Sequence, residues 1–187
     1  MRCLCLAAGL LAPALVSGLA AADPVPTTTA TPAPACCTAC PVRGADDLVR
    51  MGRGELEALY RGAEMRPIPT GFARGTAIMK PGSRTTVPAS RVTRLLWKGK
   101  VLSDDGMMVN KLAFGVRAIH ARVYSGVSWL DGRPSIIMDY CGTSRLFPNV
   151  RDEVRELCPG LYLGLTHIRR DSGPELVTFF ALTTATH

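Results

Sequence analysis

Residues 119–124 read Ile-His-Ala-Arg-Val-Tyr and form the clearest strand signal in the chain. Apolar and polar side chains alternate through this stretch, so every second residue faces the same side of a β-strand. One side is predicted to face a core, and the other is predicted to be ordinary sheet surface in water. The core side carries Ile119, Ala121 and Val123, and the water side carries His120, Arg122 and Tyr124.

Further strands are predicted on both sides of this one, because short runs of β-branched, aromatic and apolar residues are separated by turn signals. Ser103-Asp-Asp-Gly106 is a turn of the kind that joins hairpin strands. Gly115 is expected to mark a bulge or bend in a run long enough for one bent strand or two. The predicted strands are residues 71–79, 92–102, 107–124, 134–140, 161–169 and 176–184.

Short helices are predicted near the start of this region and near its end. Asp46 and Asp47 can cap a first helix, and residues 55–63 place apolar side chains on one face. Proline, glycine, serine and threonine predict a loop after the first strand, as far as Pro88. Six or seven antiparallel strands with one or two short helices predict a mainly β (α+β) fold. A small antiparallel β-barrel or strongly curved sheet, lipocalin-like, is expected because closure removes exposed strand edges.

The late helix is predicted over residues 149–158, with Asn149 as its cap and Pro159-Gly160 as its stop. Its charged residues would then form ion pairs three and four positions apart. If these charged residues have a function, Asp139 or Tyr140 at a strand end is expected to meet Arg151 or Arg155 beside a pocket mouth. The simpler interpretation is a solvated charged face.

The N-terminal residues read as a secretory signal over residues 1–22. An apolar run follows Arg2, and Ala20-Ala-Ala22 supplies the small side chains of a cleavage site. A membrane anchor is the alternative, but the run is short and broken by Pro13. Residues 23–45 are predicted to be a disordered Thr/Pro-rich tether with a cysteine cluster, and residues 46–187 a single barrel-like domain. The expected location is therefore secreted or periplasmic.

The chain is basic, with 22 Lys and Arg against 15 Asp and Glu, a net charge of +7. Between Met65 and Ser103 there are eight basic residues and no acidic one. An exported protein is not expected to bind nucleic acid, so an envelope surface or an acidic small molecule is the more available partner. The simplest interpretation is a solvated face of an antiparallel sheet.

Five cysteines follow the predicted cleavage site, namely Cys36, Cys37, Cys40, Cys141 and Cys158. Export favours disulfides, and an odd number leaves one cysteine over. Cys141 and Cys158 are predicted either to pair with each other or to pair with the N-terminal cluster. A metal site is not favoured, because the histidines offer no ligand spacing near that cluster.

Three segments together resemble an uncharacterised bacterial domain family, over about residues 71–182. They are Trp97-Lys-Gly-Lys100 with the residues before it, Ser128-Trp-Leu-Asp-Gly-Arg-Pro134 running into Asp139-Tyr140, and Arg151-Asp-Glu-Val-Arg155 leading to Pro159-Gly-Leu-Tyr-Leu-Gly164. The resemblance implies a strand-rich domain similar to lipocalin-like barrels. It implies no activity, and a fold does not fix a function.

Three functions are weighed for the domain. The first is a binding module for a small apolar or amphipathic, lipophilic or anionic ligand, with Arg94 or Arg122 recognising a head group. The second is an enzyme with a polar pocket around Asp139 and His120. The third is an envelope-associated protein that acts through its basic face. No cofactor or metal is expected, and the oligomeric state is left open. The candidate ligand-binding residues are Trp97, His120, Arg122, Trp129, Asp139, Tyr140, Arg151, Arg155 and Tyr162.

Overall fold

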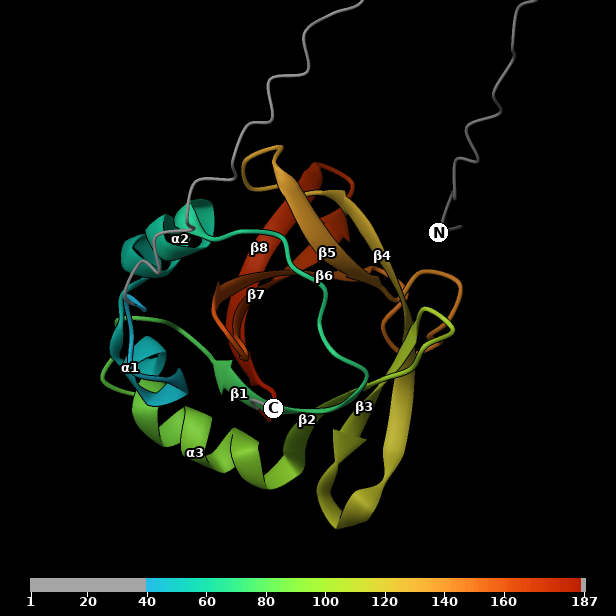
Figure 1. The fold of residues 1–187 in the computed structure, drawn as a ribbon, viewed down its shortest axis with the longest axis horizontal. Coiled ribbons are helices and arrows are strands. Elements are labelled where there is room, and N and C mark those ends of the chain that lie inside the picture. The colour runs from blue at the N-terminus through green and yellow to red at the C-terminus, as the bar shows by residue number, and fades with distance from the viewer. Residues whose placement is uncertain (1–39, 186–187) are drawn as a thin grey trace, which may run out of the picture. The chain divides into compact units, whose positions relative to one another are not determined.

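The computed structural model describes residues 40–185, and its main feature is a closed antiparallel β-barrel. Each strand pairs with the next one along the chain, and the last pairs back with the first (Figure 1). The strands are β1 Gly71–Ile78, β2 Trp97–Leu102, β3 Met107–Leu112, β4 Arg117–Val127, β5 Pro134–Asp139, β6 Val150–Cys158, β7 Leu161–Arg170 and β8 Gly173–Thr183. The prediction of a mainly β, antiparallel barrel is confirmed, with an up-and-down strand order that lipocalins also have.

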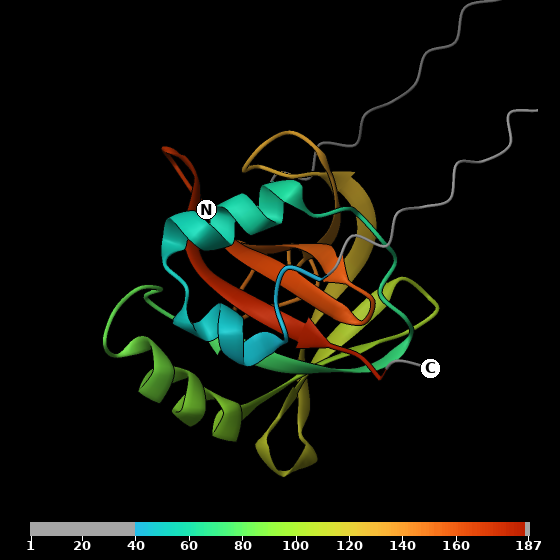
Figure 2. The ribbon, with the colours of Figure 1, turned by 60° about the vertical axis from the view of Figure 1, so that its left-hand side comes forward.

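Three α-helices lie outside the barrel: α1 Ala45–Arg50, α2 Arg53–Gly62 and α3 Thr86–Leu96. The first two cover the outer face of β7 and β8, as Figure 2 shows. Leu48 and Leu56 are buried there against apolar side chains of those strands. Within residues 40–185, none of the helices is both long enough and apolar enough to cross a membrane.

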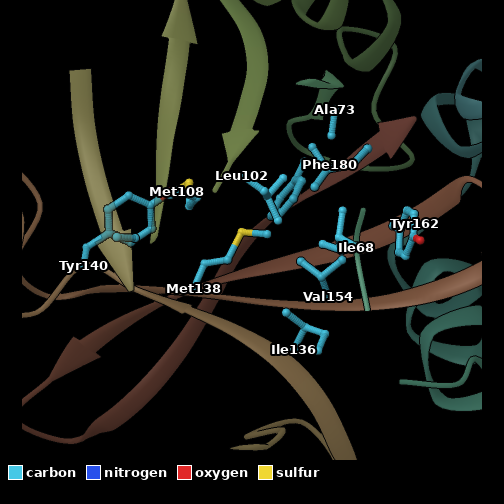
Figure 3. Close-up of a cluster of buried hydrophobic side chains, with 12 residues drawn as sticks. Ile68, Ala73, Leu102, Met108, Ile136, Met138, Tyr140, Val154, Tyr162 and Phe180 are labelled. Carbon is cyan, nitrogen blue, oxygen red and sulfur yellow. The ribbon is translucent and has the colours of Figure 1, made fainter. Parts of the chain in front are cut away.

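Apolar side chains from all eight strands fill much of the barrel interior, and Figure 3 shows this cluster. Residues 64–70 cross one end of the barrel (Figure 1) and insert Ile68 between side chains of the cluster. The Tyr162 hydroxyl donates a hydrogen bond of 3.1 Å to the carbonyl of Pro67. One end of the barrel is therefore closed by the chain's own segment. The cluster comprises Ile68, Ala73, Leu102, Met108, Ala121, Ile136, Met138, Tyr140, Val154, Tyr162, Phe180 and Leu182.

Two glycines make room for aromatic rings inside the barrel. A Cβ atom on Gly164 would lie 2.2 Å from the ring of Phe180, and one on Gly75 would lie 2.5 Å from the ring of Trp97. The two rings meet edge to face, with their centroids 5.9 Å apart. Because the rings occupy the space beside these backbones, this part of the barrel is packed with side chains.

The predicted late helix is wrong, because Val150–Cys158 is strand β6. Val150, Val154 and Cys158 are four residues apart, a spacing that fits one helix face but also one strand face. The side chains of Asp152 and Val154 face the barrel interior, and those of Arg151, Glu153 and Arg155 are buried on its outer side. The expected helical ion pairs are absent among these residues, since Asp152 and Arg155 lie on opposite faces of the strand.

Two other predicted boundaries change. Residues 92–96, predicted as strand, belong to α3, which also takes in part of the predicted loop before Pro88. The long run of 107–124 is two strands joined by a short 3-10 turn, η1 Ala113–Gly115. Gly115, with a φ of 76°, lies in that turn as the predicted bend.

Cys158 forms a disulfide with Cys40 and not with Cys141. Of the two predicted pairings, the structure therefore has the one with the N-terminal cluster. Cys141 is buried and does not take part in this disulfide. Val42 packs with α1 and α2, so the contacts of the barrel domain extend upstream of the predicted boundary at Asp46. The predicted signal peptide and most of the predicted tether lie outside the described residues.

Candidate functional site

A polar network crosses the barrel interior around Lys100. The ammonium group of Lys100, on β2, donates to the hydroxyl of Tyr140 at 2.7 Å and to the carboxylate of Asp152 at 2.9 Å. It also reaches the side-chain oxygen of Asn110 at 3.3 Å. That oxygen accepts a second hydrogen bond of 2.9 Å from the indole nitrogen of Trp97. Strands β2, β3, β5 and β6 therefore meet through polar side chains in the middle of the barrel.

Burial and the neighbouring polar groups have opposite effects on the pKa of Lys100. Burial disfavours the ammonium of Lys100, but Asp152 and Tyr140 favour it more strongly, so the pKa of Lys100 lies above its ordinary value. Burial raises the pKa of the Tyr140 hydroxyl to about 12, with Asp152 adding to the effect. The second oxygen of Asp152 accepts from Thr166 at 2.7 Å. The three donors of Lys100 are all used, so the barrel supplies its own counter-ion to the buried charge.

A second polar cluster lies on the outer side of β6 and is covered by residues 128–130. Glu153 is fully buried there and accepts hydrogen bonds from Arg151 at 2.5 Å, from the backbone of Trp129 at 2.8 Å and from the hydroxyl of Ser128. The guanidinium of Arg151 stacks on the ring of Trp129, 4.0 Å from its centroid. His167 Nδ1 lies 3.7 Å from Glu153 and has no hydrogen-bond partner among the described residues. Burial lowers the pKa of His167.

Arg155 holds a third cluster together, also outside the barrel. Its guanidinium forms two hydrogen bonds of 2.7 Å with the carboxylate of Asp131 and donates to the carbonyl of Tyr60 at 3.0 Å. Those hydrogen bonds hold the pKa of Asp131 below its ordinary value. These hydrogen bonds join α2 to the β4–β5 turn. Arg155 is completely buried, so its guanidinium is not accessible to a ligand.

The remaining predicted site residues do not converge on one cavity. His120 and Arg122 are exposed on the outer face of β4, where the sequence places them. Asp139 pairs with Arg169 at 2.7 Å and accepts from Tyr124 at 3.2 Å, so its carboxylate does not reach His120. The enzyme hypothesis stays a prediction, with His120 on the outer face of β4 and Asp139 in an ion pair with Arg169.

A surface pocket of about 640 Å³ lies where α3 meets β1, β2 and η1. Trp97 is the one predicted ligand-binding residue that lines it. The indole contacts the interior through Phe180 and Asn110 and also reaches this pocket. The pocket is lined by Phe72, Arg74, Gly75, Arg94, Leu95, Trp97, Lys98, Lys111, Leu112, Phe114 and Gly115.

Basic side chains surround the apolar part of this pocket. Arg94 pairs with Asp46, and its Nε atom is buried without a hydrogen-bond partner among the described residues. Lys98 donates to the carbonyl of Arg94 at 2.9 Å, and Lys111 lies over the ring of Phe72, 4.6 Å from its centroid. Within residues 40–185 no carboxylate pairs with Arg74, Lys98 or Lys111, and none lines the pocket. The pocket is apolar in its walls and positive at its rim.

Sequence reasoning found part of this pocket and missed the rest. Trp97 and Arg94 were candidates as a wall residue and a head-group contact. Lys111 and Phe114 gave no signal, because their role depends on a hairpin that brings η1 beside α3. Lys100 was counted only as part of the basic stretch, and the structure places it inside the barrel rather than on a solvated face.

Comparisons with known proteins do not assign the chain to a family. No protein-family model and no curated protein matches the chain. A solved structure, described only as the crystal structure of a protein from Thermomonospora curvata, is similar at 17% identity with a TM-score of 0.49. The match covers 73% of this chain and 89% of that one. The resemblance to an uncharacterised bacterial family therefore stays an expectation.

Proposed function

We propose that this protein is a binding module for a small anionic amphiphile. The ligand is held in the pocket that α3, η1 and strands β1, β2 and β3 form. The observation that carries the proposal is the pairing of apolar walls with unneutralised cations at the rim. Binding sites for small molecules are typically concave and mostly apolar, with a few polar groups that fix orientation. An alkyl chain or ring would lie against Trp97, Leu95 and Leu112.

The rim favours a carboxylate or phosphate as the head group. Lys111 and Arg74 flank the backbone of Gly99 on the outer side of the barrel, since Gly99 pairs with both residues in the sheet. Their charges therefore converge on one side of the pocket, and cations bind carboxylate and phosphate through charge-assisted hydrogen bonds. A volume of about 640 Å³ lies within the range of small-ligand sites.

The barrel interior is a weaker candidate for the same ligand. Its central cation, Lys100, already has Asp152 as a partner and is 2% exposed. A ligand's head group would have to displace a buried carboxylate of the protein to reach it. The pocket at Trp97 requires no such displacement.

A fluorescent fatty acid, 11-(dansylamino)undecanoic acid, tests the proposal in direct titration, with its methyl ester as the uncharged control. We expect the acid to bind and the ester to bind about tenfold more weakly, because the ester lacks the charge-assisted hydrogen bonds. Replacing Lys111 and Arg74 together with glutamine should remove most of this difference. Equal binding of acid and ester, or an unchanged preference in that double variant, would rule the pocket out.

A further inference from the structure

The α3 helix carries most of its large apolar side chains on its outward side, while Val87 packs against the buried cluster that α1 and α2 form with β7 and β8. Its barrel-facing side carries small polar residues, Thr86 and Ser90, which are each 2% exposed. The Ser90 hydroxyl donates to the carbonyl of Ala77 on β1. Val92, Leu95 and Leu96 lie on the outward side and are 59%, 65% and 65% exposed. A surface helix normally buries its apolar stripe against the core.

The tip of the β3–β4 hairpin extends this outward apolar face. Phe114 is fully exposed and has a φ of 55°, in the left-handed region that a residue with a bulky side chain rarely adopts. Hydrogen bonds between Leu112 and Val116 and between Val116 and Ala113 hold the turn in place. Val116 is also exposed, and Phe114 and Leu95 line the same pocket, so the tip lies beside α3.

Positive charge borders this apolar face. Arg91 lies on α3 beside Val92, and Arg117 follows Val116 at the start of β4. Both are exposed, and neither forms an ion pair within 4.0 Å in the part of the chain that the structure describes, although the charge of Arg91 also acts on the Asp46 carboxylate of α1. We call the outward residues Val92, Leu95, Leu96, Phe114 and Val116, with Arg91 and Arg117, the α3–η1 face.

We propose that the α3–η1 face docks on an anionic membrane surface, with its apolar side chains in the headgroup region and its cations on lipid phosphates. Exposed leucine, valine and phenylalanine with flanking arginines are what interfacial helices present to anionic lipid. A second copy of the chain is a poorer occupant, because a symmetric contact would place like charges opposite each other. An exposed apolar group of this size also needs a partner of some kind.

The α3–η1 face and the amphiphile pocket share Leu95 and Phe114, so the two proposed sites are neighbours. A ligand leaving a membrane would meet the pocket at the edge of the docked surface. Docking does not depend on the pocket, however, since Val92, Leu96, Val116, Arg91 and Arg117 do not line it. Either proposal can therefore fail alone.

Sedimentation with vesicles tests the docking, using the full chain with phosphatidylglycerol mixed equally with phosphatidylcholine, or phosphatidylcholine alone. We expect binding only to the anionic vesicles, weakened at high salt. Replacing Val92 and Leu96 with serine should lower the vesicle affinity about tenfold. Replacing Arg91 and Arg117 with glutamine should lower it by a similar factor.

Matched controls separate this surface from other parts of the chain. Val127→Ser removes an exposed valine at the other end of β4, and Arg122→Gln removes an exposed arginine from its middle. Both should bind vesicles as the unchanged protein does. Every variant keeps residues 1–39, so any vesicle binding by that segment is common to all of them. Hydrogen exchange with anionic vesicles should slow at residues 91–98 and 112–117 and stay unchanged at 128–133.

Several results would overturn the docking proposal. One is equal binding to both kinds of vesicle, and another is an exchange pattern that does not change at α3 and η1. A dimer in solution that the Val92 and Leu96 substitutions dissociate, without vesicle binding, would assign the face to a second copy. The double serine variant should still bind the dansylated fatty acid in solution, so loss of vesicle binding alone leaves the pocket standing.

Discussion

Lys100 places an ammonium group in the middle of the barrel, where an unpaired charge would be very costly. Its partners Asp152, Tyr140 and Asn110 come from three other strands. The network therefore links distant parts of the sequence through one side chain. Nothing in the sequence around Trp97-Lys-Gly-Lys100 distinguishes this lysine from its exposed neighbours, because a bulge between Trp97 and Gly99 changes which residues face inward.

Lys100→Met is expected to lower the free energy of unfolding by about 3–5 kcal/mol, because it leaves the Asp152 carboxylate buried without its cation. Replacing Asp152 with asparagine in the same chain should recover part of that loss. Lys98→Met, on the same strand, should change the value by less than about 1 kcal/mol. Urea denaturation measures the free energy of unfolding of the unchanged protein and of these three variants. A Lys100→Met loss no larger than that of Lys98→Met would contradict the network.

His167 should make stability depend on pH. Burial lowers its pKa below the ordinary 6.5, so the unfolded chain binds the proton more readily than the folded one. Stability is then complete above about pH 6.5 and is lost as the pH falls from there through the folded-state pKa. The charges facing His167 are Glu153 and Asp152, which favour protonation, and Arg151 and Arg53, which oppose it.

Thermal unfolding between about pH 7.5 and pH 5 measures this dependence. The variant His167→Gln should lose less stability on acidification than the unchanged protein. The matched variant at exposed His120, His120→Gln, should follow the unchanged protein. A His167→Gln profile parallel to that of the unchanged protein would show that other groups cause the acid sensitivity.

Strand β6 shows why sequence patterns predicted most of the barrel and failed at one element. Its charged residues occupy both faces, since Asp152 faces the interior network while Glu153 and Arg155 are covered by α2 and the β4–β5 turn. A strand buried on both sides does not show a simple alternation of apolar and polar residues. By contrast, β4 has one side in water, and its alternation predicted both its structure and the exposure of His120 and Arg122.

Gly164 on β7 makes room for the ring of Phe180 on β8. Gly164→Ala would place a Cβ atom 2.2 Å from that ring, so we expect a loss of about 1–3 kcal/mol in the free energy of unfolding. Gly62→Ala on α2 is the control, because no atom lies within 4 Å of its new Cβ. That change should be neutral or slightly stabilising. Similar effects at the two positions in denaturant unfolding would contradict the packing of Phe180.

The Cys40–Cys158 disulfide connects the residues before α1 to the end of β6, 118 positions apart in the sequence. Replacing both cysteines with serine should lower the free energy of unfolding by about 2–5 kcal/mol. Cys141→Ser controls for the loss of a thiol elsewhere. Mass spectrometry with and without reductant should show the bond in the unchanged protein. If reductant leaves the unfolding midpoint unchanged, the disulfide does not stabilise the fold.

The molecule combines a barrel that has a packed interior with a surface pocket beside α3. The sequence predicted the closed β architecture, because alternating strands and frequent turns require closure to protect their edges. It did not predict the pocket as a unit, since Arg74, Trp97 and Lys111 come from three strands and meet only where β1, β2 and β3 pair. The α3 helix was missed because the residues as far as Pro88 read as a loop and residues 92–102 read as a strand, although Val92, Leu95 and Leu96 have helical spacing.

The proposed function places the ligand beside Trp97 and not inside the barrel. Chemical-shift mapping by nuclear magnetic resonance, with dodecanoate titrated into isotope-labelled protein, measures this location directly. We predict shifts at the Trp97 indole, at residues 72–75 and at 111–115, with little change at Met138 and Val154. Shifts centred on Met138 and Val154, or no shifts at all, would show that the pocket at Trp97 is not the binding site.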